Sequence, residues 1–359
     1  MFRLRWLFAD GDAKVVGAEP RPLEERDKSM TSCGYRAGTI WDPTRRDWRN
    51  QGARPIHWAV WYPCRKSGAE SGRAGGFFEP GAISHGAPLA GEGPYPVVLL
   101  SHGTGGIADS LGWLARALVA EGFVVIGANH HGNTGAEDYR AEGFLCWWER
   151  APDLSVLLTE MSQSGPFAGR LDLARVSVAG FSLGGYTALA LAGARTSMEN
   201  FHAWCAETGI DMRGPREFPD VADHVPELME TSAEFRQSWD RQSDDFCDPR
   251  IKSVVAIAPA PPVRGFFPDS LATIQVPVTL ITGGADIEAP TTHCADWLVE
   301  RNPGFAHHEI GADVGHYTFL DLPADRSMAG TVDIFTDAPG VDRAAVHTKT
   351  SRLVIEALV

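Results

Sequence analysis

The chain has 359 residues, of which 44% are hydrophobic and 22% are charged, a composition typical of globular proteins and not of disordered ones. Its formal net charge of −14 argues against binding to nucleic acid or to an anionic membrane, because both surfaces attract basic proteins. No apolar run is long enough for a transmembrane helix, and the six cysteines show no spacing typical of metal fingers.

Near the N-terminus, the apolar run from Trp6 to Ala9 is shorter than the core of a signal peptide. We therefore expect a cytoplasmic protein with reduced thiols, and one or two disulfides are the alternative for the cysteines. A longer natural N-terminus would make a periplasmic or secreted protein the alternative. Residues 1–50 are polar and weakly patterned, and they predict an N-terminal arm with room for one edge hairpin. Residues 51–359 are predicted to form one domain.

The first clear strand pattern covers residues 57–62 and ends at Pro63. Residues 65–95 are rich in Gly, Ser, Ala and Pro without a period, which predicts a surface loop. Residues 96–100 form a continuous apolar run, typical of a strand buried on both faces, and they lead into the glycine-rich loop Ser101–Gly106. Helical spacing follows this loop.

Beyond this point, segments with strand and helix patterns alternate. Further strands are predicted at residues 123–128, 176–179, 252–258, 277–282 and 306–310, and further helices at residues 151–161, 186–191, 292–300 and 342–357. Because the strands are almost continuously apolar, this alternation predicts an α/β fold with a mostly parallel central sheet and helices on both faces.

The stretch from Arg175 to Leu191 is the most informative part of the chain. A short β-branched strand enters the turn Gly180-Phe181-Ser182-Leu183-Gly184, and an Ala/Leu-rich helical pattern follows. This strand–GxSxG–helix arrangement is typical of a nucleophile elbow, in which a strained turn exposes the serine hydroxyl at the edge of a sheet. We therefore predict that Ser182 is a nucleophile.

A serine nucleophile needs a histidine base, and the histidine needs a carboxylate that holds its tautomer. In the elbow fold these groups follow the serine in the order acid, then histidine. Asp286 follows a Gly-Gly turn directly after a predicted buried strand, and His316 ends the loop after the next strand. The prediction is therefore Asp286 as the acid and His316 as the base, with Glu288 and Asp313 as alternative acids.

An oxyanion hole would complete the site. One donor in the elbow fold is the backbone N–H after the nucleophile, here Leu183, and we assign the second to Thr104 in the glycine-rich loop. That loop lacks the lysine of a phosphate-binding loop, and no HExxH or comparable spacing of metal ligands is present. We expect neither a cofactor nor a metal.

Residues 195–250 exceed what a minimal fold of this kind needs. Their charged sequence carries the large aromatic residues Trp204, Phe218, Phe235, Trp239 and Phe246. This composition suits a cap over the elbow; the alternative is a surface insertion that packs a small core of its own. Trp147 and Trp148 are candidates for the same pocket or for the core.

Several of these motifs together resemble bacterial predicted dienelactone hydrolases, which are α/β-hydrolases similar to the platelet-activating-factor acetylhydrolase group. The likeness runs over most of residues 54–322. It rests on these segments: Arg54-Pro55, residues 60–63, the SHGTGG loop, residues 129–134, Pro152-Asp153-Leu154-Ser155, GFSLGG, residues 254–260 and Gly315-His316.

The resemblance implies an α/β-hydrolase fold with a serine-type mechanism, with two departures. True dienelactone hydrolases use a cysteine where this chain has Ser182. In the acetylhydrolase group the acid follows the strand after the elbow, but the matching place here, near Pro259, has no carboxylate, which favours Asp286.

The sequence therefore predicts a serine esterase that acts on a small-molecule ester. Amide or lactone hydrolysis, or acyl transfer, by the same residues is the alternative, and a non-catalytic binding protein on this scaffold is a third hypothesis. The sequence makes no prediction of oligomeric state.

Overall fold

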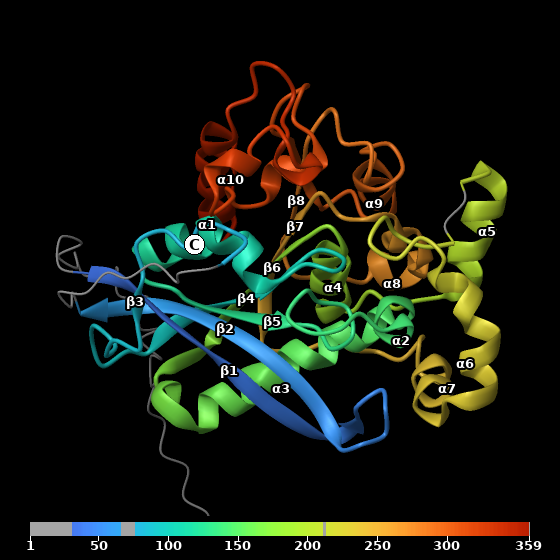
Figure 1. Ribbon diagram of the computed structural model, residues 1–359, viewed down its shortest axis with the longest axis horizontal. Helices are drawn as coiled ribbons and strands as arrows, with labels where there is room; N and C mark the ends of the chain where they lie inside the picture. The colour runs from blue at the N-terminus through green and yellow to red at the C-terminus, as the bar shows by residue number, and fades with distance from the viewer. Residues whose placement is uncertain (1–30, 66–75, 211–212, 359) are drawn as a thin grey trace, which may run out of the picture.

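The computed structural model describes residues 31–65, 76–210 and 213–358. Within these ranges the chain forms one nine-stranded sheet, in the order β3-β1-β2-β5-β4-β6-β7-β8-β9 (Figure 1). The strands are β1 (Thr31–Arg46), β2 (Ala53–Arg65), β3 (Ser84–His85), β4 (Tyr95–Ser101), β5 (Val124–Asn129), β6 (Leu171–Phe181), β7 (Ile251–Ile257), β8 (Val278–Thr282) and β9 (Ala306–Glu309). Strands β4 to β9 run parallel to one another, whereas β2 is antiparallel to both β1 and β5.

Helices cover both faces of the sheet, as the alternation of patterns predicts (Figure 1). The helices are α1 (Gly112–Ala120), α2 (Ala141–Leu145), α3 (Arg150–Gln163), α4 (Leu183–Leu191), α5 (Met198–Thr208), α6 (Val225–Thr231), α7 (Ala233–Asp240), α8 (Pro268–Ala272), α9 (Ala295–Arg301) and α10 (Arg343–Leu358). One core lies between the sheet and α3, α4, α8 and α9, and a second lies between the sheet and α1 and α10. The parallel strands are thus packed against a core on each face of the sheet. In open α/β sheets, ligands bind at the edge formed by the carboxyl ends of these strands.

Within the predicted N-terminal arm, residues 31–46 form β1, which pairs with β2 from Thr31↔Arg65 to Asp42↔Arg54. The strand has no regular apolar alternation, and glycines interrupt it. Their place becomes clear only in the pair: a Cβ at Gly34 would lie 2.4 Å from the ring of Tyr62, and one at Gly38 would lie 2.6 Å from the ring of Trp58. The glycines make room for the large side chains of β2. Residues 1–30 lie outside the described part of the chain.

Residues 195–250 contain α5, α6 and α7, which lie together beside the carboxyl edge of the sheet, at the right of Figure 1. Their apolar residues share a third core with α2 and the turn after it, including Phe144, Trp148, Phe201 and Phe235. The apolar residues of this segment are therefore buried in a core that it shares with the rest of the domain. None of the helices in the described ranges is long and apolar enough to cross a membrane.

Candidate active site

Ser182 lies at the turn between β6 and α4, with φ 56° and ψ −119°, a left-handed conformation that L-residues rarely adopt. The flanking glycines are required by close backbone contacts. A Cβ at Gly180 would lie 2.0 Å from the carbonyl oxygen of Gly184, and a Cβ at Gly184 would lie 2.0 Å from that of Ser101. The sequence thus folds into a nucleophile elbow that aims Ser182 beyond the sheet edge.

The structure brings Ser182, His316 and Asp286 into one chain of hydrogen bonds. The Oγ of Ser182 lies 3.0 Å from Nε2 of His316, and Nδ1 of His316 lies 2.7 Å from Oδ2 of Asp286. All three residues are buried. Asp286 follows β8, and His316 lies in the turn after the β9 loop, so three separate strand ends supply the three side chains.

The second oxygen of Asp286 is also held. Its Oδ1 accepts hydrogen bonds from the backbone N–H groups of Glu288 (3.0 Å) and Ala289 (2.7 Å), which fix the carboxylate facing the histidine. Of the two alternative acids, Glu288 lines the pocket and Asp313 is exposed. In the described part of the chain, the carboxylate on Nδ1 of His316 is that of Asp286.

The residues assigned to the oxyanion hole both border the pocket next to Ser182. A Cβ at Gly103 would lie 3.2 Å from the Cβ of Ser182, so the loop before Thr104 passes directly beside the nucleophile. Leu183 is the first residue of α4, where backbone N–H groups lack helical acceptors. Within the described ranges, neither the Thr104 nor the Leu183 N–H has a hydrogen-bond acceptor. Two unengaged donors beside a serine hydroxyl are what an oxyanion hole needs.

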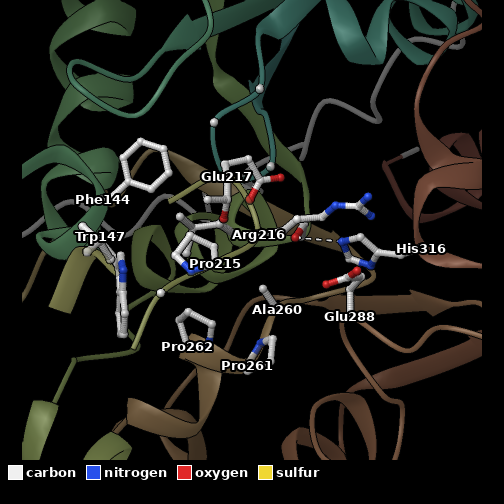
Figure 2. A pocket seen from close by; sticks show the side chains of 18 of the residues that line it. Phe144, Trp147, Pro215, Arg216, Glu217, Ala260, Pro261, Pro262, Glu288 and His316 are labelled. Carbon is white, nitrogen blue, oxygen red and sulfur yellow. Dashed lines mark hydrogen bonds between the residues drawn. The ribbon is translucent and has the colours of Figure 1, made fainter. Parts of the chain in front are cut away.

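A cavity of about 1340 Å³ opens over Ser182 (Figure 2). Its lining is shared between the sheet edge and the 195–250 segment, which contributes among others Trp204, Glu217 and Trp239. Residues 195–250 therefore form part of the pocket wall as well as part of the third core. Trp147 also lines the cavity, whereas Trp148 is buried and donates its Nε1–H to the carbonyl of Ser238.

Charged groups gather on the side of the cavity near His316. Figure 2 shows Glu217 and Glu288 pointing into this region from two different segments. Burial and the nearby Glu288 raise the pKa of Glu217 above its usual range. Arg216 forms an ion pair with Asp333, and its guanidinium lies 5.9 Å from the ring centre of Tyr317.

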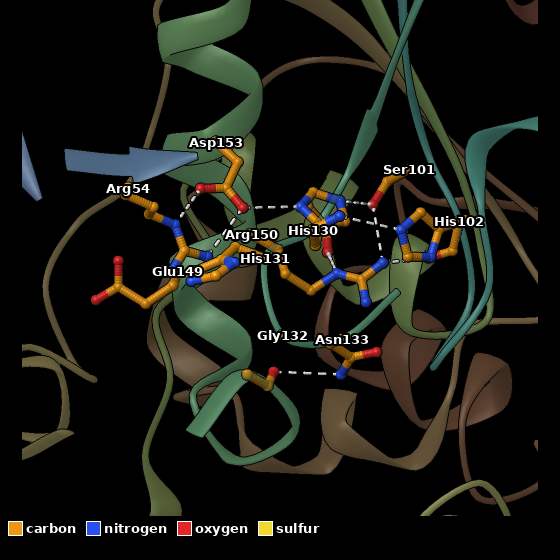
Figure 3. A network of polar contacts seen from close by, with 12 residues as sticks. Arg54, Ser101, His102, His130, His131, Gly132, Asn133, Glu149, Arg150 and Asp153 are labelled. Carbon is orange, nitrogen blue, oxygen red and sulfur yellow. Dashed lines mark hydrogen bonds and ion pairs between the residues drawn. The ribbon is translucent and has the colours of Figure 1, made fainter. Parts of the chain in front are cut away.

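A buried polar network lies behind the Ser101–Gly106 loop (Figure 3). Its residues were not among the site residues predicted from the sequence. Asp153 accepts hydrogen bonds from Arg54 (2.8 Å) and from Nδ1 of His130 (3.1 Å). Burial opposes ionisation of Asp153, but Arg54 and Arg45 outweigh it and hold its pKa well below the usual range. Segments 129–134 and 152–155 appeared in the sequence analysis only as parts of the family resemblance. Their spacing in the sequence did not predict that they lie in contact.

The adjacent histidines do not share a ligand site. His130 contacts Asp153 and Ser101, whereas Nδ1 of His131 lies 2.7 Å from Glu137. Across the residues that the structure describes, no group of three or more His, Cys, Asp or Glu side chains could hold a metal ion.

Comparisons with known proteins agree with this architecture. The model of the PETase family, described as PET hydrolase-like, matches residues 67–222, a segment that contains the Thr104 loop and the Ser182 elbow but ends before Asp286 and His316. No match was found among curated proteins.

Among solved structures, a ferulic acid esterase from Streptomyces cinnamoneus superposes with a TM-score of 0.53 at 17% identity, over 91% of this chain and 88% of that one. A putative dipeptidyl aminopeptidase IV from Bacteroides ovatus gives a TM-score of 0.48 at 14% identity, over 91% of this chain and 36% of that one.

The strand order, the elbow, the family match and the likeness to the ferulic acid esterase define an α/β-hydrolase fold, which confirms the fold predicted from the sequence. More narrowly, the chain is similar over residues 67–222 to the PET hydrolase-like family, which belongs to the dienelactone hydrolase-like clan of this fold.

Proposed function

We propose that this protein is a serine hydrolase that cleaves carboxylic esters through an acyl-enzyme intermediate. The observation that carries the proposal is the continuous hydrogen-bonded path from Ser182 through His316 to Asp286 on the floor of a large cavity. The similarity to the PET hydrolase-like family and to a ferulic acid esterase supports ester bonds as the target.

Each residue has one role in this mechanism. His316 takes the proton of Ser182 as the serine oxygen attacks the ester carbonyl, and it returns that proton to the departing alcohol. Asp286 keeps a proton on Nδ1 of His316, so that Nε2 is free to act as the base. The N–H groups of Thr104 and Leu183 stabilise the negative oxygen of the tetrahedral intermediate, and water activated by His316 then releases the acid.

The shape of the cavity bears on the substrate. Its volume of about 1340 Å³ exceeds what a small acyl group needs, and its walls carry rings from Phe144, Trp147, Phe201, Trp204 and Trp239. Aromatic walls favour bulky apolar groups, which fit a rigid pocket at low entropic cost. We therefore propose a bulky small-molecule ester as the substrate, with no cofactor and, as the sequence predicts, a cytoplasmic location.

Amide or lactone hydrolysis and acyl transfer use the same residues and remain secondary proposals. They differ from ester hydrolysis in the leaving group and in the access of water to the acyl-enzyme. Turnover of matched ester and amide substrates with the same acyl group would rank these activities.

The direct test is Ser182→Ala. Because the hydroxyl acts as the nucleophile and alanine keeps the Cβ of serine, we expect kcat on p-nitrophenyl esters to fall about 10⁴-fold or more with the fold intact. A fluorophosphonate probe should label the wild type and not the variant. A purified, folded wild type that the probe does not label would favour a non-catalytic binding protein instead.

A further inference from the structure

Arg150 lies at the start of α3, and its side chain is almost completely buried between the Ser101–Gly106 loop and α4. Figure 3 shows the guanidinium group reaching toward Ser101 and His102. Its Nη2 donates to the backbone carbonyl of His102 and, at 3.3 Å, to Oγ of Ser101. Its Nε donates to Oγ1 of Thr187 at 3.1 Å. One planar group is therefore bonded to two separate parts of the active-site wall.

Both sets of contacts lead to a proposed oxyanion donor. His102 precedes Thr104 by two residues on the same loop. On the other side, Oγ1 of Thr187 donates to the carbonyl of Leu183 at 3.0 Å, across one turn of α4. Arg150 thus connects the segment that carries the Thr104 N–H with the residue that carries the Leu183 N–H.

The rest of the loop is held by fixed partners. The ring of His102 bonds through Nδ1 to the carbonyl of Gly103 (2.6 Å), and Asn133 accepts from the N–H of Gly105 (2.7 Å). The hydroxyl of Tyr139 donates to the carbonyl of Gly105 at 2.8 Å. These hydrogen bonds fix the conformation of the loop, but none of them involves α4. Within the described residues, the direct side-chain connection between the loop and α4 is Arg150.

The environment of Arg150 is unusual for a structural arginine. Across the described ranges, no carboxylate lies within ion-pair distance of its guanidinium, and its charge faces the carbonyl of His102 and two hydroxyl groups instead. Burial lowers the pKa of Arg150 to about 9, so the group is still charged at neutral pH. A buried cation without a direct counter-charge costs free energy. Only the planar guanidinium group, with five N–H donors in fixed directions, can make these bonds; a lysine or a neutral residue cannot.

We infer that Arg150 is a positioning residue that sets the spacing between the two N–H donors of the oxyanion hole. It acts through His102 on Thr104 and through Thr187 on Leu183, and touches neither substrate nor reacting atoms. The inference rests on the proposed function, because it assigns Arg150 a part in that reaction. The donors must lie close to the position where the oxyanion forms. A small change in their spacing therefore reduces the stabilisation of the transition state more than it reduces the binding of the substrate.

Thr187→Val tests the connection with the smallest change. Valine keeps the shape of threonine but removes the hydroxyl that joins Arg150 to the Leu183 carbonyl. We expect kcat per active site, counted by fluorophosphonate titration, to fall roughly 10-fold with KM little changed. Inhibition by a boronic acid that forms a tetrahedral adduct on Ser182 should weaken by a similar factor. Thr187→Ser restores the hydroxyl and should recover most of the rate.

Two further variants separate positioning from stability. Arg150→Lys keeps the charge but not the fork, and should lower kcat roughly 10- to 100-fold without moving the pH profile of kcat/KM. Thr348→Val removes the same kind of hydroxyl-to-carbonyl bond, from Thr348 to Ala344 (2.9 Å), in the remote helix α10, and controls for the loss of a helical hydroxyl.

The outcomes are distinct. Thr187→Val and Arg150→Lys enzymes with the wild-type kcat per titrated site would overturn the positioning role, while a dead Ser182→Ala enzyme would leave the proposed function standing. Equal losses in Thr187→Val and Thr187→Ser would also overturn it, since the hydroxyl would then not matter. A wild type that the probe does not label would refute the proposed function and this inference with it.

Discussion

The carboxylate of Asp286 is bound on both oxygens, by the ring of His316 on one and by the N–H groups of Glu288 and Ala289 on the other. This arrangement makes the orientation of the acid independent of the substrate. An asparagine at the same place could keep its oxygen on the two N–H groups, but it would then present an NH₂ group to Nδ1 of His316. The ring would carry its proton on Nε2 and could not accept one from Ser182.

We therefore expect Asp286→Asn to lower kcat on the order of 10³- to 10⁴-fold while the fold survives. The measurement is steady-state turnover of a p-nitrophenyl ester, with thermal unfolding as the check on folding. Asp313→Asn is the matched control: Asp313 is exposed in the loop before His316, and its loss should leave the rate near that of the wild type. An Asp286→Asn enzyme at near wild-type rate would remove Asp286 from the mechanism.

At the scale of residues, the sequence indicated the residues of the proposed triad but not the groups that hold them. Ser182, Asp286 and His316 could be found because each lies in a local pattern: an elbow, a turn after a buried strand, or a loop of known order. Arg150 lies in no such pattern. Its partners, Ser101, His102 and Thr187, are distant in sequence, and their contact depends on how α3 packs against the sheet.

At the scale of elements, the 195–250 segment and the loop after β8 both supply charges to the wall of the cavity. Glu217 comes from that segment and Glu288 from that loop, and both line the cavity near His316. Arg216, which also lines the cavity, is already paired with Asp333. The wall near the triad is therefore net negative, and it should disfavour an ester whose acyl chain ends in a carboxylate.

This expectation can be measured with two p-nitrophenyl esters of equal chain length, one neutral and one ending in a carboxylate. The neutral ester should have the higher kcat/KM. Glu288→Gln should raise the relative kcat/KM of the anionic ester by roughly 5-fold, since removal of one charge a few ångströms away is worth about 1 kcal/mol in a solvated cleft. Glu230→Gln, an exposed position on α6 outside the cavity lining, is the charge-matched control. An unchanged ratio in Glu288→Gln would show that Glu288 does not face the acyl chain.

Elements with a strong local sequence pattern could be predicted, and elements without one could not. Strands buried on both faces, such as β4, β5 and β8, carry continuous apolar runs, and the structure confirms them within one or two residues. Strand β1 has no such run, because its glycines accommodate the rings of β2 and its identity as a strand depends on that pairing. The 195–250 segment was visible as an excess of sequence, but its place in the wall of the cavity depends on tertiary contacts.

At the scale of the whole molecule, the same burial that stabilises both cores makes the fold sensitive to acid. His102 and His130 are buried next to each other, with ring centres 5.1 Å apart, and His347 is buried on α10. Burial is the main cause that lowers the pKa of each: to about 3 for His130, to about 4 for His347 and well below the usual range for His102. The unfolded chain would protonate all three near pH 6.5. The folded state is thus favoured above that pH and loses this advantage as the pH falls toward the folded pKa values.

We expect the free energy of unfolding to fall between about pH 7.5 and about pH 5.5, with a slope that approaches about 1.4 kcal/mol per pH unit for each buried histidine once the pH is below 6.5. The range stops there because Asp321, whose pKa is raised by burial, acts in the opposite direction at lower pH. Urea unfolding midpoints across this range give the slope.

His347 offers the sharpest test of this origin, because it lies on α10 and is not part of the adjoining pair of His102 and His130. Its ring stacks on Trp113 at a centroid distance of 4.2 Å, and its Nε2 lies 2.9 Å from the carbonyl of Thr318. In His347→Gln, the amide can still donate to that carbonyl but cannot take up a proton in the unfolded chain. The variant should be less stable than the wild type at about pH 7.5, because the stacking on Trp113 is lost. Its free energy of unfolding should fall less steeply as the pH is lowered, and the difference in slope should equal the contribution of one buried histidine. A variant with the wild-type slope, or a wild type whose stability does not change over this range, would mean that the buried histidines do not control the acid sensitivity of the fold.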